Sequence, residues 1–204
     1  MKIKSRFIVF LFLSVLVTYC KAQSLIKPLD GGGACPTYDT NCYEKDTTNE
    51  LPKFSGTWKY QSGNTEITFK LKKEEHYQIS NNRNFLDLLV GEYQYVENGL
   101  ELANTLAQFD NPFVSGYRHS ISGSVFMHRL PSYYCEDNSE PAEIKLNVNI
   151  SHPTDTDVDG QLILRYVNDS GIEKLEVCVY DQTTLGDGDV RTLIPDGQYV
   201  FVKQ

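Results

Sequence analysis

Basic residues are scarce in this 204-residue chain, which contains 19 Lys and Arg residues against 27 Asp and Glu residues and carries a formal net charge of −8 at pH 7. Proteins that bind nucleic acid neutralise its phosphates with clustered Lys and Arg side chains. The acidic balance therefore excludes nucleic acid as an expected partner. An excess of negative charge favours solubility instead.

The common sequence signatures of catalysis and of structural zinc are also missing. No C-x-x-C pair occurs among the five cysteines, and the four histidines show no ligand-like spacing. Ser124, in "SGSVF", follows a Gly but precedes none, so it does not complete the G-x-S-x-G pattern of serine hydrolases. Carboxylates are too numerous for a catalytic pair to be recognised without geometry. We therefore expect a protein that is not an enzyme and has no cofactor, apart from one calcium candidate considered below.

Long apolar runs are limited to the N-terminus. Lys2, Lys4 and Arg6 precede "FIVFLFLSVLV" (7–17), which is the order of charges and apolar residues in a secretory signal peptide. The run is shorter than the about 20 apolar residues that span a bilayer. We expect residues 1–19 to be a signal peptide and the protein to be exported.

Two cleavage sites compete at the end of this signal. Cys20 follows "VTY", which resembles a bacterial lipobox, although Tyr19 stands where a small residue is usual. Cleavage after Ala22 would extend the signal to residues 1–22 and discard Cys20. We favour lipid attachment at Cys20, which would anchor the protein to a membrane as a cell-envelope or outer-membrane lipoprotein. Without acylation we expect a periplasmic or extracellular protein.

Four cysteines follow Cys20, an even number that suits disulfides in an oxidising compartment. Four cysteines allow three pairings. Cys35 and Cys42 are separated by six residues in a Gly-, Asp- and Thr-rich segment, so a small local loop is easy to close. A bond between Cys135 and Cys178 would tie a loop to a strand. We favour the pairs Cys35–Cys42 and Cys135–Cys178 over free or metal-bound thiols.

Residues 20–53 lack apolar periodicity and are rich in Gly, Pro, Thr, Asp and Asn. This composition is typical of a loop or tether. We therefore expect a flexible stalk over residues 20–53. The remainder, residues 54–204, has the length of one ordinary domain.

The remainder shows the two-residue alternation of half-buried strands. It is clearest over residues 143–150, where four apolar side chains alternate with polar ones such as Lys145. Further strands are expected over 57–61, 65–72, 88–99, 122–130, 161–167, 173–180 and 198–203. Only 84–89 and 97–109 have a helical character. Short strands separated by turns predict an all-β domain of about eight strands, a single antiparallel barrel or alternatively a β-sandwich. We expect it to be a monomer.

Phe54, Gly56 and Trp58 form an F-x-G-x-W pattern at the start of the first strand of this domain. The pattern resembles the opening motif of lipocalin-like barrels, in which the Gly permits a tight turn into the strand and the Trp plugs one end of the barrel. The resemblance implies a lipocalin-like barrel.

A wider resemblance covers nearly the whole exported chain. The segments "CKAQ", "FSGTWKY", "DLLVGEYQYVENG" and "IPDGQYVFVKQ" are together similar to a family of small secreted proteins from Gram-negative bacteria. That family carries only a domain-of-unknown-function label. The resemblance implies a compact β domain and supplies no catalytic residue.

Asp155, Asp157 and Asp159 in "DTDVDG" match the first half of a calcium-binding loop, in which alternate carboxylates converge on one cation. The twelfth position of such a loop should be Glu, but here it is Tyr166. The alternative is an acidic turn between two strands, with Asp and Gly serving turn geometry. We favour the turn and keep calcium as the one candidate cofactor.

These observations predict an exported, non-enzymatic binding module of the cell envelope. Its ligand would be a small apolar molecule, a cation or an envelope protein, held at the barrel mouth or on an acidic loop. The alternative is a structural or interaction protein of the envelope whose barrel is filled by side chains. A packed core around Trp58, Phe69 and Leu146 would exclude the version in which a ligand lies inside the barrel.

Overall fold

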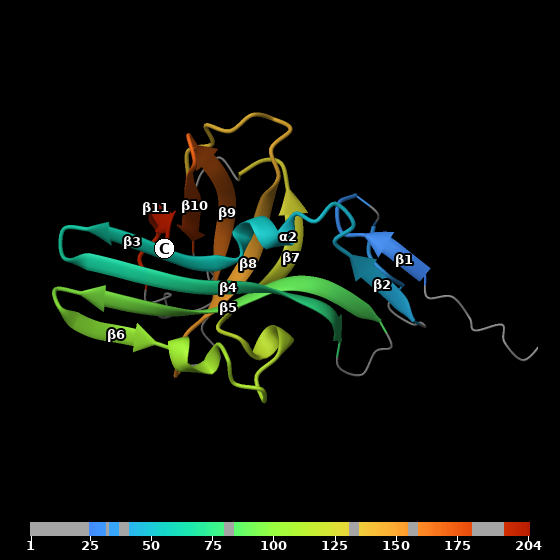
Figure 1. Cartoon of the computed structure of the whole chain (residues 1–204), viewed down its shortest axis with the longest axis horizontal. Coiled ribbons are helices and arrows are strands. Elements are labelled where there is room, and N and C mark those ends of the chain that lie inside the picture. The colour runs from blue at the N-terminus through green and yellow to red at the C-terminus, as the bar shows by residue number, and fades with distance from the viewer. Residues whose placement is uncertain are drawn as a thin grey trace, which may run out of the picture.

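The computed structural model describes residues 25–31, 33–36, 41–79, 84–130, 135–154, 159–180 and 194–204 (Figure 1). The predicted signal peptide, whether 1–19 or 1–22, lies outside these ranges, and so does Cys20. Within the described ranges, no helix has the length and apolar character needed to cross a membrane.

Eight antiparallel strands close into a barrel. They are β3 (Gly56–Ser62), β4 (Thr65–Gln78), β5 (Phe85–Glu97), β7 (Ile121–Met127), β8 (Lys145–Ser151), β9 (Asp159–Asp169), β10 (Ile172–Tyr180) and β11 (Gly197–Lys203). The order β5-β4-β3-β11-β10-β9-β8-β7 is closed by pairing of β5 with β7, in which Leu89 lies opposite Gly123. The predicted all-β barrel is confirmed, and the alternative of a β-sandwich is not what the strands form.

Two segments with predicted helical character are mainly strands, although the second, 97–109, also contains the short 3-10 helix η1 (Leu106–Gln108). β5 begins at Phe85, and β6 (Leu100–Asn104) pairs antiparallel with β5 across a turn at Asn98-Gly99. Both turn residues have positive φ, 54° and 76°, as tight hairpin turns require. The start of β5 is apolar on both faces, because Leu86, Leu88 and Val90 pack against Tyr77 and Ile79 outside the barrel. A run without alternation cannot be distinguished from a helix by periodicity.

Side chains that point into the barrel form one continuous hydrophobic cluster. Trp58, Ile67, Phe69 and Leu146 are all fully buried in it, and Ile144, just before β8, is half-buried. The rings of Phe69 and Phe201 stack with their centroids 4.5 Å apart. The interior, as lined by the described residues, is a core and not a ligand cavity. Any binding site is therefore to be sought on the outside.

The F-x-G-x-W residues close one end of this core. The indole Nε1 of Trp58 donates a hydrogen bond to the Phe54 carbonyl oxygen at 2.8 Å, and the Lys203 Nζ lies 5.3 Å from the indole ring. Gly56 has φ of 138°, and a Cβ there would lie 2.9 Å from the Lys203 Cε. The short helix α2 (Leu51–Phe54) contacts β4, β5 and β9, so it crosses the end of the barrel.

The prediction of a flexible stalk over residues 20–53 needs correction. β1 (Leu25–Pro28) and β2 (Cys42–Lys45) pair in parallel, and β2 pairs in parallel with the start of β5. Figure 1 shows both strands beside the barrel. The folded domain therefore begins before Phe54, against the predicted limits of 54–204. A disulfide and polar side chains hold this segment, so its sequence shows no apolar period.

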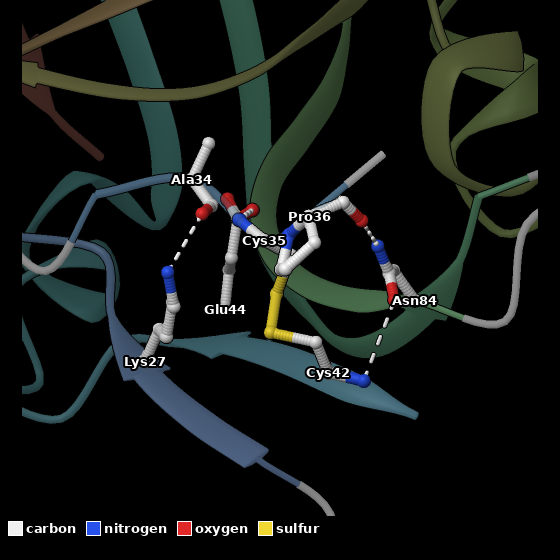
Figure 2. Close-up of a disulfide and its surroundings, with 7 residues drawn as sticks. All are labelled: Lys27, Ala34, Cys35, Pro36, Cys42, Glu44 and Asn84. Carbon is white, nitrogen blue, oxygen red and sulfur yellow. Dashed lines mark hydrogen bonds between the residues drawn. A yellow bond between two sulfur atoms is a disulfide. The ribbon is translucent and has the colours of Figure 1, made fainter. Parts of the chain in front are cut away.

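Asn84 and a disulfide hold Cys35, Pro36 and Cys42 together (Figure 2). Cys35 and Cys42 are bonded, with their Cα atoms 5.8 Å apart, in the pairing that we favoured. The Asn84 Nδ2 donates to the Pro36 carbonyl oxygen at 2.8 Å, and the Asn84 Oδ1 accepts from the Cys42 amide at 3.4 Å. One side chain, directly before β5, thus binds both Pro36 and Cys42.

A buried carboxylate, Asp87 of β5, joins the same segment to the barrel. It accepts hydrogen bonds from the Tyr43 hydroxyl at 2.5 Å, the His76 amide at 3.0 Å and the Asp46 amide at 3.1 Å. The Lys73 Nζ lies 3.4 Å from its Oδ2 atom. Burial alone would raise the pKa of Asp87, but these hydrogen bonds and the Lys73 charge together lower it.

Candidate binding pocket on the outer wall of the barrel

The connection between β7 and β8 folds back over the outer wall of the barrel. Its Cys135 is bonded to Cys178 of β10, with the Cα atoms 6.1 Å apart, which is the second pairing that we favoured. The Gln198 Nε2 of β11 donates a hydrogen bond to the Glu136 carbonyl oxygen at 2.7 Å. This part of the connection is therefore held against two strands of the barrel.

Lys145, the first residue of β8, is fully buried beneath this connection. Strand alternation places it on the outer face together with Asn147, where solvent was expected. Its Nζ donates to the His128 carbonyl oxygen at 2.9 Å and to the Ser139 hydroxyl at 2.5 Å, and it lies 3.4 Å from the Asp137 Oδ1. A lysine ammonium is buried only when it is paired in this way.

Asp137 is the negatively charged side chain that offsets the cost of burying the positive charge of Lys145. It accepts hydrogen bonds from the Leu130 amide at 3.0 Å and from the Ser139 amide at 3.1 Å. Burial alone would raise the pKa of Asp137, but these bonds and the Lys145 charge hold it well below its usual range. Asp137 is therefore ionised at neutral pH and links Leu130 and Ser139 of the connection to Lys145.

Arg165 of β9 lies directly opposite Lys145 in the strand register. Its Nε and Nη2 donate to the Glu143 carboxylate, at 3.1 and 2.8 Å, and its Nη1 donates to the Glu176 Oε2 at 2.8 Å. Burial lowers the pKa of Arg165, but these two carboxylates raise it by more. With Asp137, three carboxylates surround two cations, so both cations are already neutralised by the protein.

A pocket of about 220 Å³ lies between the connection and the barrel wall. Its apolar surface comes from Leu130, Ile163 and Val200, and its polar surface includes Arg165 and Glu176. Such a mixture suits a small molecule with an apolar body and one polar end. Within the described part of the chain, no group of three His, Cys, Asp or Glu side chains is placed to hold a metal ion.

Of the calcium candidate, only Asp159 belongs to the described residues, and it lies at the opposite end of the same strands. Asp155 and Asp157 are outside the described residues, and Asp159 begins β9 opposite Ser151 of β8. The acidic motif therefore joins two antiparallel strands, which is the position that the turn interpretation requires. Calcium binding stays a prediction, and an unchanged melting temperature during a calcium titration would contradict it.

Sequence reasoning missed the pocket, although one signal pointed to it. Ile163 stands between two inward-facing leucines of β9, and Cys178 stands between two inward-facing valines of β10. Both strands thus carry an apolar residue on the outer face as well, at Ile163 and Cys178. Strands of that kind have both faces covered, so something must lie outside the barrel at this place.

Comparison with curated proteins found no match, and comparison with solved structures found none either. A family model described as a family of unknown function, DUF6705, matches residues 1–204. The match includes the outer-wall pocket, the barrel and the segment before α2. Because the match spans the whole chain, this protein belongs to the DUF6705 family.

Proposed function

We propose that this protein is an exported, non-enzymatic binding module that holds a small ligand on the outer wall of its barrel. The observation that carries the proposal is the pocket beneath the β7–β8 connection, whose cover is fixed by the Cys135–Cys178 bond and by the ion pair of the exposed Asp137 with the buried Lys145. The filled interior supports this location, because it leaves the barrel to act as a rigid scaffold.

The charges around the pocket favour a ligand with an apolar body and a positively charged end. The donors of Lys145 and Arg165 already bind protein oxygens, so an anion would find few donors to bind. The Glu176 side chain is 42% exposed and can accept a further hydrogen bond. Ile163 and Val200 supply an apolar surface for the rest of the ligand.

Export is supported by the two disulfides, because such bonds persist in oxidising compartments. The basic and apolar start of the chain supports it independently. Acylation at Cys20 would place the binding module at a membrane of the cell envelope. Cleavage after Ala22 would release it instead.

A matched set of probes tests the ligand class. Naphthylmethylamine, naphthalenemethanol and the carboxylate of naphthaleneacetic acid share one ring system. Their polar ends are positively charged, neutral and negatively charged. We expect calorimetric titration to rank the amine first and the carboxylate last. A set in which none binds, or in which the carboxylate binds best, would contradict the proposal.

One strand offers a matched pair of variants for the same titration. Val200 lines the pocket and is 50% exposed, whereas Val202 lies two residues further on the same outer face and is 40% exposed. Val200→Arg should weaken binding of the amine at least about tenfold, because it adds bulk and positive charge at the pocket. Val202→Arg should leave binding unchanged, and equal effects of the two substitutions would count against this pocket.

The packed interior also favours a second function, that of an interaction protein without a small ligand. Leu25 and Ile26 on β1 are 54% and 53% exposed, and β1 is the last strand of the sheet among the described residues. An exposed strand edge can pair with a strand of another chain. Chemical crosslinking in whole cells, followed by mass mapping to residues 25–28, tests this alternative. We expect the isolated protein to sediment as a monomer.

A further inference from the structure

A second hollow, of about 260 Å³, lies farther along the same outer wall over β7, β8 and β9. Its polar lining comes from two serines and three amides, and an aromatic ring lines it as well. These residues are Ser122, Ser124, Asn147, Asn149, Gln161 and Tyr117. The first pocket lies over the Lys145–Arg165 register pair, whereas this hollow lies over the Asn149–Gln161 pair.

A β-bulge in β7 builds the hollow. Ser122 lies opposite Asn149, and Val125 lies opposite Asn147. Between these two pairs β7 therefore has one more residue than β8. The neighbours Ser124 and Val125 would point to opposite faces of a regular strand, yet both line the hollow. Gly123 allows this arrangement, because a Cβ there would lie 2.7 Å from the Val148 Cα.

Among the described residues, none that lines the hollow carries a charge, although 23% of the chain is charged. Each amide offers a donor and an acceptor, and each hydroxyl does the same. The Gln161 Nε2 donates to the Asn149 Oδ1 at 2.7 Å, which orients these two amides beside each other. The Asn147 Oδ1 is buried and has no hydrogen-bond partner within the described residues. A buried acceptor of this kind calls for a donor from a ligand or from water.

Tyr117 supplies the aromatic ring from the β6–β7 connection. It belongs to the short helix η2 (Gly116–Arg118) and remains 51% exposed. The preceding Gly116 has φ of 55°, and its amide donates to the Glu74 carboxylate at 2.8 Å. The Tyr117 ring meets the Tyr77 ring edge to face, with the centroids 5.7 Å apart. The tyrosine is therefore fixed in place while much of it stays open to a ligand.

We infer that this hollow binds a neutral saccharide unit. Neighbouring hydroxyls of a sugar each donate and accept, as the lining amides and serines do, and the C–H face of a sugar ring packs on an aromatic ring. An anion would need basic side chains, and a metal ion would need carboxylates, which this lining lacks. A purely apolar ligand would leave its polar side chains without partners. The volume suits a single sugar unit, whether free or at the end of a glycan.

The test uses the full exported chain and two readouts. An array of immobilised glycans detects recognition of a glycan end, and nuclear magnetic resonance titration with neutral methyl hexosides detects binding of a free sugar. We expect at least one neutral hexoside to shift the Asn147, Asn149 and Gln161 side-chain amides. Hexosamines and hexuronates, which carry charge, should bind more weakly. Absence of neutral-sugar binding in both readouts would overturn the inference.

Variants then assign any binding to the hollow. Tyr117→Ala and Asn149→Ala alter exposed side chains, and each should weaken binding about tenfold. Phe113→Ala is the matched control, because Phe113 lies in the same connection, is 83% exposed and does not line the hollow. Binding that survives both Tyr117→Ala and Asn149→Ala would refute the assignment. Val200→Arg should leave sugar binding intact, which separates this inference from the function proposed for the other pocket.

Discussion

Replacement of Asp87 by Asn tests the account of how the N-terminal segment is held to the barrel. The substitution preserves the shape of the side chain and removes its charge. Asp87 binds two N–H donors through different oxygens, His76 through Oδ1 and Asp46 through Oδ2. In either orientation the new NH₂ group faces one of these donors. Either the buried Asp46 amide or the part-buried His76 amide therefore loses its acceptor, and the ion pair of Lys73 with Asp87 is lost as well.

These losses set the size of the effect. An unsatisfied buried amide costs about 1–3 kcal/mol, and breaking a buried ion pair costs about 3–5 kcal/mol when no other partner remains. Lys73 keeps Asp46 at 3.4 Å and Glu75 at 3.0 Å, so the second cost is reduced. We expect Asp87→Asn to lower the free energy of unfolding by about 3 kcal/mol. In a domain of this size that corresponds to a fall in Tm of roughly 6–12 °C.

Urea unfolding at pH 7, followed by Trp58 fluorescence, measures the change directly. Trp58 is the single tryptophan and is fully buried, so its emission reports unfolding of the barrel core. Asp169→Asn is the control, because Asp169 is an exposed carboxylate paired with Lys174, and we expect no measurable loss there. A loss below about 1 kcal/mol for Asp87→Asn would refute the reasoning, because it would not cover even one unsatisfied amide.

The acid dependence of stability gives the same experiment a second readout. The pKa of Asp87 is lower in the folded protein than its ordinary value of 3.8. Its contribution is therefore fully present above about pH 4 and is lost as the pH falls through the lowered pKa of the folded protein. The Asn variant lacks this titration. Its stability should therefore fall less steeply than that of the wild type below pH 4.

Three further predictions concern other parts of the molecule. Joint replacement of Cys135 and Cys178 by Ala should lower the free energy of unfolding in urea by about 2–4 kcal/mol. It should also abolish naphthylmethylamine binding in calorimetry. Retained binding would contradict the role of the disulfide in holding the cover of the pocket. His119→Ala removes the hydrogen-bond partner of buried Glu92, 2.8 Å away, and should cost about 3 kcal/mol by the same unfolding assay. The exposed His128→Ala is the control and should cause no loss. Intact mass of the membrane-fraction protein should show an acylated Cys20 as the first residue, and a chain that starts at Gln23 would contradict the lipid anchor.

The sequence predicts correctly those strands that have one apolar face and one polar face. β8 carries Leu146, Val148 and Ile150 inside and Asn147 and Asn149 outside, and its limits came close to the observed Lys145–Ser151. The start of β5 is covered on both faces, so its pattern misled the prediction towards a helix. β1 and β2 are held by a disulfide and by carboxylates. Interactions of these two kinds produce no apolar periodicity in the sequence.

The pockets were less accessible to sequence reasoning than the disulfides. Cysteine count and spacing restrict the pairings to a few, and both favoured bonds are present. The pockets depend on which connections fold back over the barrel, and such long-range contacts leave only indirect traces. Lys145 looked like a solvated strand residue, because its partner Asp137 comes from the connection that covers it.

The folded N-terminal segment changes how close this domain would stand to a membrane. A stalk of more than thirty residues would let a domain drift far from its anchor. Here β1 begins at Leu25, so an acylated Cys20 would be separated from the folded body by a chain of at most about 18 Å, taking 3.6 Å per residue. A tether of this length would confine the domain to the layer next to the lipid headgroups. Its two outer-wall pockets would then sample molecules at that surface more than molecules in the bulk.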